Sequence, residues 1–200
     1  GLVALGLVHP KHVKRNADAK PGDVLVLGKP LGVGVMSAAL KKGELGEAGY
    51  AQMIASTTRL NTPGPDLAAL PGVHALTDVT GFGLLGHLLE ICRGAGLAAK
   101  VSAAQLPVMP AAVGFAKQGI GPGAIGRNLA SYRLSVSFEE GIEEWQRSVM
   151  ADAQTSGGLM VACDPASADE VLEVFRQGGF TDATVIGRME AGLPKVHVTA

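Results

Sequence analysis

The stretch from Leu76 to Glu90 holds the residues of this sequence that are best suited to chemistry. An apolar run at 73–76 predicts a short buried strand, and leucines from position 84 onward recur at helical spacing. Threonines, one acid and glycines lie between the two. A strand that turns directly into a helix exposes backbone N–H groups beside the positive end of the helix dipole. The stretch therefore predicts a binding site for a negatively charged group.

Asp78 in this stretch has two interpretations. A carboxylate just before a helix can cap that helix by accepting hydrogen bonds from its first N–H groups. It can also hold a divalent cation that bridges to phosphates, because Mg²⁺ takes oxygen ligands, commonly one or two carboxylates plus substrate phosphates. The residue type and its position leave both interpretations open.

The glycines of the same stretch raise a rival interpretation. Gly81, Gly83 and Gly86 have the GxGxxG spacing of dinucleotide-binding folds, after a strand and at the start of a helix. Those folds also place an acid about 20 residues further on to bind the ribose. Residues 96–106 contain no Asp or Glu, and Asp78 would face the pyrophosphate without a metal. The sequence therefore disfavours a dinucleotide oxidoreductase.

A second polar turn covers residues 152–158 and leads into a predicted buried strand at 159–163. Thr155, Ser156 and Gly157 in this turn either offer hydroxyl and N–H groups to a ligand or only shape the start of the strand. The second interpretation is favoured.

Two glycine-rich loops are further candidates for anion binding. The first contains Gly28, Gly32 and Gly34 but lacks the GK[ST] ending of a P-loop, which favours a tight connection without a ligand. The second covers residues 119–126, of which four are glycine, and ends at Arg127. That guanidinium could clamp an anion through two hydrogen bonds or be a surface charge, and the sequence leaves this open.

Histidines and cysteines give weaker signals. His87 lies on the predicted central helix, where a buried, hydrogen-bonded structural role is favoured over catalysis. His9 and His12 are three residues apart with a proline between them, which favours a turn over a metal site. Cys92 and Cys163 are far apart and outside any CxxC motif, so we expect small buried hydrophobes in a reducing compartment.

Composition limits the classes of function. The chain has 200 residues, of which 47% are hydrophobic and 18% charged, and a net charge of −1 without a basic cluster. Nucleic acid is therefore not an expected partner. No apolar run is long enough to span a membrane, and no signal peptide is evident, so we expect no membrane partner. The first residue is Gly rather than Met, which suggests a piece of a longer protein.

Strands and helices alternate along the chain, which predicts an α/β (α+β) fold with helices layered on a mixed β-sheet of five to seven strands. Thr57, Thr58 and Asn61, near the end of one helix, are expected in solvent. Strands are predicted at 2–8, 23–28, 73–76, 97–102, 134–138 and 159–163, with a closing pair at 183–189 and 196–198. Helices are predicted at 35–42, 47–60, 66–70, 139–149 and 165–177. The central helix is predicted to end at about 93, and another helix to run from 107 or 110 to 118.

Together these motifs resemble selenophosphate synthetase, also called selenide, water dikinase. Residues 77–87 are similar to the central motif of that family, and residues 152–159 to its Asp-Pro-Gln-Thr-Ser-Gly-Gly-Leu motif, with Ala153 in place of the proline. Residues 20–23 and 28–32 also fit, although Val33 stands where the family usually has a hydroxyl residue. The resemblance covers this whole chain but only the C-terminal part of that enzyme. It implies the C-terminal domain of the aminoimidazole ribonucleotide synthetase-like fold.

The resemblance implies part of an ATP-dependent enzyme that makes selenophosphate from selenide, ATP and water, with AMP and phosphate as products. Asp78 is the residue expected to bind Mg²⁺ at an interdomain active site. Thr77, Thr80, Gly81 and Asn128 are candidate nucleotide-binding residues, the last because an Arg-Asn pair closes a comparable loop in the family. No catalytic residue is expected here, because the family's nucleophilic Cys or selenocysteine and its Lys lie further upstream.

The resemblance also implies an N-terminal ATP-binding domain, so residues 1–19 are expected to connect that domain to a C-terminal α/β domain at 20–200. We expect a cytoplasmic homodimer with ATP and selenide as substrates, and no activity from this chain alone. Two alternatives stay open: a related ATP-dependent enzyme of the same superfamily, against which the Thr-Ser-Gly-Gly turn argues, and a non-catalytic anion-binding domain.

Overall fold

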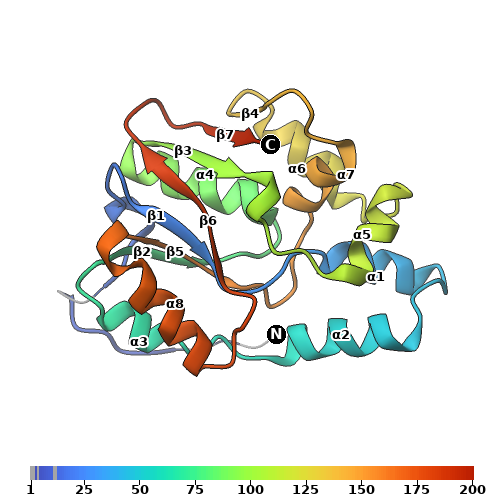
Figure 1. Cartoon of the computed structure of the whole chain (residues 1–200), viewed down its shortest axis with the longest axis horizontal. Coiled ribbons are helices and arrows are strands. Elements are labelled where there is room, and N and C mark those ends of the chain that lie inside the picture. The colour runs from blue at the N-terminus through green and yellow to red at the C-terminus, as the bar shows by residue number, and fades with distance from the viewer. Residues whose placement is uncertain (1–2, 4, 11–12) are drawn as a thin grey trace.

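A computed structural model describes residues 3, 5–10 and 13–200 of the chain. In that part of the chain, seven strands form one mixed sheet in the order β2-β5-β1-β6-β3-β7-β4 (Figure 1). Strand β7 pairs in parallel with β3 and β4, and all other neighbours are antiparallel. The strands are β1 (Val24–Leu27), β2 (Val73–Asp78), β3 (Ala98–Ser102), β4 (Val136–Phe138), β5 (Leu159–Cys163), β6 (Thr184–Glu190) and β7 (Val196–Thr199).

Successive residues of a strand point to opposite sides, so these strands carry apolar side chains on both faces of the sheet. Helices cover both faces. In β1, Leu25 and Leu27 belong to a large apolar cluster, whereas Val26 belongs to a smaller one. The large cluster lies under α4, α1, α5 and α7, and the small one under α3 and α8 (Figure 1). The helices are α1 (Val33–Lys41), α2 (Glu47–Thr58), α3 (Gly64–Ala69), α4 (Gly83–Ala95), α5 (Pro110–Lys117), α6 (Ala124–Tyr132), α7 (Glu144–Met150) and α8 (Ala168–Gln177).

Helix α4 is the central element of the large cluster. Its leucines recur at helical spacing, and Leu84, Leu85 and Leu88 are completely buried. The helix ends at Gly96, whose left-handed backbone (φ 69°) suits a residue without a side chain. The prediction of this helix from leucine spacing is confirmed, because the regularly spaced leucines are the ones that are buried.

The structure corrects two predictions about strands. The predicted closing pair does not form, because β3 lies between β6 and β7 and hydrogen-bonds to both. The strand predicted at 2–8 is also wrong for residues 3 and 5–8, which are extended without a ladder; residues 2 and 4 lie outside the described part. An isolated apolar run cannot show whether a partner strand exists.

The structure also corrects the region after residue 119. Helix α6 begins at Ala124, inside the predicted glycine-rich loop, and the sequence did not predict it. Glycine lowers helix propensity, so Gly126 hides the start of this helix. The predicted helix at 139–149 is shorter and begins at Glu144.

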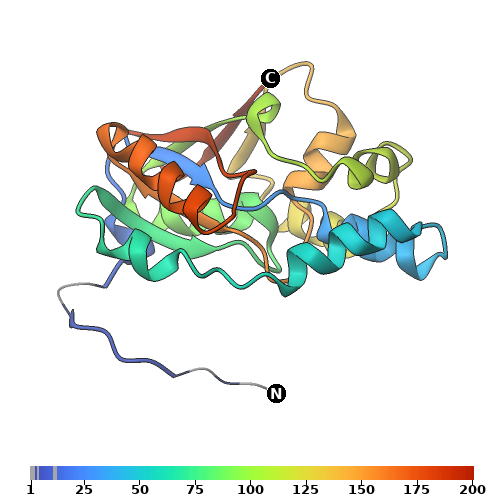
Figure 2. The ribbon, with the colours of Figure 1, turned by 60° about the horizontal axis from the view of Figure 1, so that its bottom comes forward.

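The N-terminal segment differs from the rest. Residues 5–10 extend away from the body of the domain, and Leu5 and Leu7 are 95% and 105% exposed (Figure 2). Packing begins near Lys14, whose ammonium donates hydrogen bonds to the carbonyls of Leu70 and Val73. Nothing observed tests the domain boundary predicted at residue 20, which stays a prediction. Among the residues described, no helix is both long and apolar enough to cross a membrane.

We expect Leu88→Ala to lower the free energy of unfolding by about 2–5 kcal/mol, because it removes a completely buried side chain and leaves a cavity. The same change at Leu134, which is 82% exposed, should alter it by less than about 0.5 kcal/mol. Urea denaturation of both variants measures the two values. Equal losses would show that α4 is not the packing centre.

Candidate functional site

Asp78 is the last residue of β2, beside the start of β5, and its side chain is exposed. Within the described residues its carboxylate has no hydrogen-bond or ion-pair partner. The capping interpretation is wrong, because α4 begins five residues later with Phe82 as its N-cap and no side-chain cap. Asp78 is therefore a free carboxylate at the end of a strand.

The loop that follows Asp78 is held by bonds from distant segments. The Val79 amide donates to the Gly158 carbonyl at 2.9 Å, and the Thr80 carbonyl accepts from the Gln154 amide at 3.0 Å. The Gly81 carbonyl accepts from the Asn128 side-chain amide at 3.0 Å. The peptide groups at 79–81 are thus fixed from two separate segments of the chain, while Gly81 itself stays exposed.

The predicted nucleotide-binding residues have different environments in this loop. Thr77 is half-buried on β2, and the Thr80 hydroxyl lies 3.0 Å from Nε2 of His87. His87 is thus buried and hydrogen-bonded, as expected from the sequence. Asn128 is buried and donates to both Gly81 and the Ala151 carbonyl, so its side-chain nitrogen is already used within the protein. Through one of these bonds, Asn128 holds the Gly81 carbonyl of the loop after Asp78.

The second polar turn caps a helix. The completely buried Asp152 accepts hydrogen bonds from the amides of Gly34 and Val35, at 2.9 and 3.1 Å. Gln154 accepts from the two preceding amides, Gly32 and Val33, at 3.2 and 3.3 Å. These two side chains occupy the N–H groups at the start of α1. The first glycine-rich loop is therefore a structural connection, as predicted.

Burial raises the pKa of Asp152 to about 6, against the lowering effect of the bonds from Val35, Gln154 and Gly34. Its Oδ1 is buried without a hydrogen-bond partner in the described part of the chain. A side chain at Gly34 would collide with this oxygen. The position of the Asp152 carboxylate therefore requires a residue without a side chain at position 34.

Close backbone contacts fix the rest of this turn. A side chain at Gly157 would overlap the Val79 carbonyl, and one at Gly158 would overlap the backbone of Lys29. The Asn61 side chain donates to the Gly157 carbonyl at 2.9 Å, so the prediction of a solvated Asn61 is wrong. Sequence could not reveal this bond, because its partners are 96 residues apart.

Lys29 is the buried cation of this region, with 3% exposure. Its ammonium donates to the carbonyls of Ser56, Arg59 and Ser156, at 3.1, 2.7 and 2.7 Å. Burial, followed by the nearby Arg59 charge, lowers the pKa of this amine. Sequence reasoning missed Lys29; its only signal was a lysine directly after an apolar strand.

Ser156 is held in a left-handed backbone conformation (φ 51°) that non-glycine residues rarely adopt. Such conformations persist where surrounding structure enforces them, often at functional sites. Here the bond from Lys29 and the adjacent Gly157 contact enforce it. The side chains of Thr155 and Ser156 remain exposed beside the Asp78 loop.

The remaining candidates do not form part of this site. Gly83 and Gly86 contact the backbone at Ala151 and the side chain of Phe82, so the GxGxxG spacing serves packing. Cys92 and Cys163 are buried, and burial raises the pKa of each thiol to about 12. The turn expected at His9 and His12 falls partly outside the described residues, which do not include His12. Where the structure describes the chain, no group of three His, Cys, Asp or Glu side chains gathers at one point.

We expect the pH dependence of stability to identify Asp152. Because its folded-state pKa of about 6 exceeds the value of about 3.9 in an unfolded chain, the folded state holds this proton more strongly. The stabilisation of the folded state by this proton is complete below about pH 4 and is lost as pH rises through about 6. As pH rises from 4 to 7, the unfolding free energy of the wild type should therefore fall relative to that of Asp152→Asn, by about 3 kcal/mol at most.

Urea denaturation between pH 4 and pH 7 measures this difference. Asp169→Asn, which changes an exposed acid on α8, is the matched control and should follow the wild type at each pH. If Asp152→Asn also runs parallel to the wild type, the buried carboxylate does not titrate in this range.

Comparison with known proteins finds relatives that align over nearly the whole chain. The chain is 58% identical over 198 residues to a selenide, water dikinase from Pseudomonas straminea, and 59% identical over 198 residues to one from Burkholderia ambifaria. Each alignment covers 99% of this chain and 56% of the relative. The chain therefore spans little more than half the length of these relatives.

Solved structures with low sequence identity share the fold. A thiamine-monophosphate kinase from Stenotrophomonas maltophilia superposes with a TM-score of 0.68 at 22% identity, over 96% of this chain and 54% of that one. The hydrogenase maturation protein HypE in complex with ATP gives a TM-score of 0.64 at 19% identity, over 92% and 50%. Residues 20–198 match the family described as AIR synthase related protein, C-terminal domain. The chain therefore belongs to this family of C-terminal domains, in the fold that the sequence predicted.

Proposed function

We propose that this chain is the C-terminal part of an ATP-dependent enzyme that makes selenophosphate from selenide, ATP and water, with AMP and phosphate as products. The relatives at 58–59% identity carry the name of that activity. The HypE structure with ATP shows that another protein of this fold binds the nucleotide. The proposed whole enzyme includes an N-terminal ATP-binding domain and works as a cytoplasmic homodimer.

Asp78 is the residue that this proposal assigns to Mg²⁺. The observation that carries it is an exposed carboxylate, without a protein partner among the described residues, next to a loop fixed by three long-range hydrogen bonds. One carboxylate fits Mg²⁺, which keeps several waters and takes further ligands from substrate phosphates. When bound, the ion would neutralise charge on the transferring phosphoryl group.

The chain's own residues would position that carboxylate. Hydrogen bonds with Gly158, Gln154 and Asn128 hold the peptide groups at 79–81. Asp78 therefore projects from a rigid strand end. Thr77, Thr80 and Gly81 lie on the same strand end and loop. Phosphoryl transfer depends chiefly on positioning and charge neutralisation, so a fixed acid at this point has a direct use.

We expect Asp78→Asn in the full-length enzyme to keep the fold and lower selenide-dependent ATP turnover about 100-fold or more, because the amide cannot neutralise the cation. Titration with Mg²⁺ should show a higher half-saturating concentration. Asp169→Asn, again an exposed acid, should retain wild-type turnover. Full activity of Asp78→Asn at low Mg²⁺ would remove the proposed metal role.

We also expect the 200-residue chain alone to make no selenophosphate, because the reactive groups of the proposed enzyme lie outside it. ³¹P NMR of the chain with ATP, Mg²⁺ and selenide measures this directly, and the full-length enzyme is the positive control. Product from the chain alone would show that the active site is assembled from these residues.

A further inference from the structure

A large cavity lies between α1, α6 and the 152–158 turn, away from Asp78. Its volume is about 590 Å³. One wall is the end of α1, with Lys41 and Lys42, and the opposite wall is the glycine-rich loop and Arg127. Thr155 of the polar turn completes it. The cavity thus touches the 152–158 turn, and Asp78 at the end of β2 is not among the residues that line it.

The charge of this cavity is entirely positive. Lys41, Lys42 and Arg127 line it, and no acidic side chain does. None of these three cations forms an ion pair with a residue that the structure describes. All three side chains are exposed, so water screens their mutual repulsion, and an anion in the hollow would meet three positive charges without a competing carboxylate in the lining.

Backbone N–H groups add to this positive potential. Helix α6 begins at Ala124 in the cavity wall and has no side-chain cap. The amides of Gly121 and Gly123 donate to no group in the described part of the chain. The start of α1 is different, because Asp152 and Gln154 already occupy its amides. The molecule thus supplies its own carboxylate to one helix start and surrounds the other with cations.

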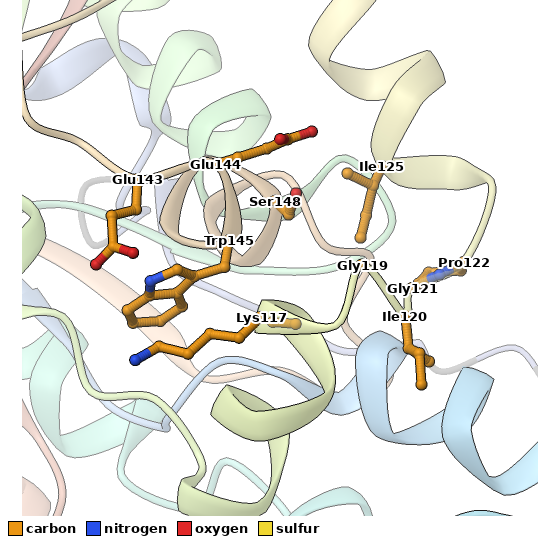
Figure 3. A pocket seen from close by; sticks show the side chains of 11 residues that line it. Lys117, Gly119, Ile120, Gly121, Pro122, Ile125, Glu143, Glu144, Trp145 and Ser148 are labelled. Carbon is orange, nitrogen blue, oxygen red and sulfur yellow. The ribbon is translucent and has the colours of Figure 1, made fainter.

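A second cavity on the other side of the same loop serves as a comparison. It has a volume of about 470 Å³ and shares Gly121 and Pro122 with the first. Figure 3 shows Glu143, Trp145 and Lys117 together in it, with the Lys117 ammonium 5.3 Å from the centre of the Trp145 ring. Two acids, Glu143 and Glu144, line this second cavity together with one base, Lys117. The purely positive character therefore belongs to one side of the loop.

We propose that the cavity between α1 and α6 binds a phosphate-type oxyanion, held by Lys41, Lys42 and Arg127 and by the free amides of the glycine loop. An Arg guanidinium can bind two oxygens of such an anion at once, and lysines supply point charges. The volume leaves room for a group attached to the phosphate. Of the two interpretations of Arg127 that the sequence left open, this proposal adopts anion binding.

The test uses inorganic phosphate and the whole 200-residue chain, without Mg²⁺. Titration followed by ¹⁵N NMR should shift the amides of Gly121, Gly123 and Ala124 in a saturable manner. The triple variant Lys41→Gln, Lys42→Gln, Arg127→Gln should bind at least about tenfold more weakly, because charge-assisted hydrogen bonds are lost. Arg127→Gln alone keeps the test valid if the triple variant unfolds, and should weaken binding severalfold.

Arg133→Gln is the matched control, because Arg133 is an exposed arginine at the opposite end of α6, outside the cavity. Its phosphate affinity should equal that of the wild type. Asp78→Asn should also leave phosphate binding unchanged, so failure of the metal proposal and failure of this one are distinguishable. Absence of amide shifts in the wild type, or equal binding by Arg127→Gln and the wild type, would overturn the proposal.

Discussion

The capping of α1 by Asp152 and Gln154 is the interaction on which the candidate site depends. Four consecutive amides at the start of that helix are bonded to side chains about 120 residues further along the chain. An unpaired N–H group buried away from water costs free energy, so this match fixes where the two segments meet. Once Asp152 is placed, the turn that follows it must pass directly under the loop after Asp78.

The turn at 152–158 joins the surrounding segments by contacts of different kinds. Lys29 ties the Ser156 carbonyl to the end of α2, and Gly157 and Gly158 allow backbone to touch backbone. Each contact excludes water from one side of the turn, while the hydroxyls of Thr155 and Ser156 stay on the outer side. The result is a rigid frame with the Thr155 and Ser156 side chains exposed, while Oδ1 of Asp152 is buried without a partner among the described residues. Such an arrangement suits a ligand that must be held in one orientation.

The fold class was predictable from sequence because it rests on local periodicity. The continuous apolar run of β1 and the helically spaced leucines of α4 each report their own burial, and both elements lie close to their predicted positions. Strand neighbours were not predictable, because pairing joins residues that are distant in sequence, as the position of β3 between β6 and β7 shows. Helix α6 was hidden by its glycine.

The candidate site was predictable only in part, for a related reason. The position of Asp78 between a strand and a helix marked it as a candidate, but only the structure shows that its carboxylate does not cap α4. The partners of Asn61, Asn128 and Lys29 are backbone carbonyls far along the chain, and a carbonyl leaves no mark in a sequence. The cavity between α1 and α6 combines residues near 40, near 125 and near 155, and only the folded chain shows that their charges have one sign.

The sheet topology has a consequence for how the chain acquires its structure. In the part of the molecule described, every ladder joins one of the first four strands to one of the last three. During synthesis on the ribosome, the strands up to residue 138 therefore emerge without a native partner, and the sheet can start to form only after residue 159 appears. Until then their unpaired edges are open to association with other nascent chains. The arrival of β5 gives partners to β1 and β2, and the exposure of β3 and β4 ends only when β6 and β7 follow.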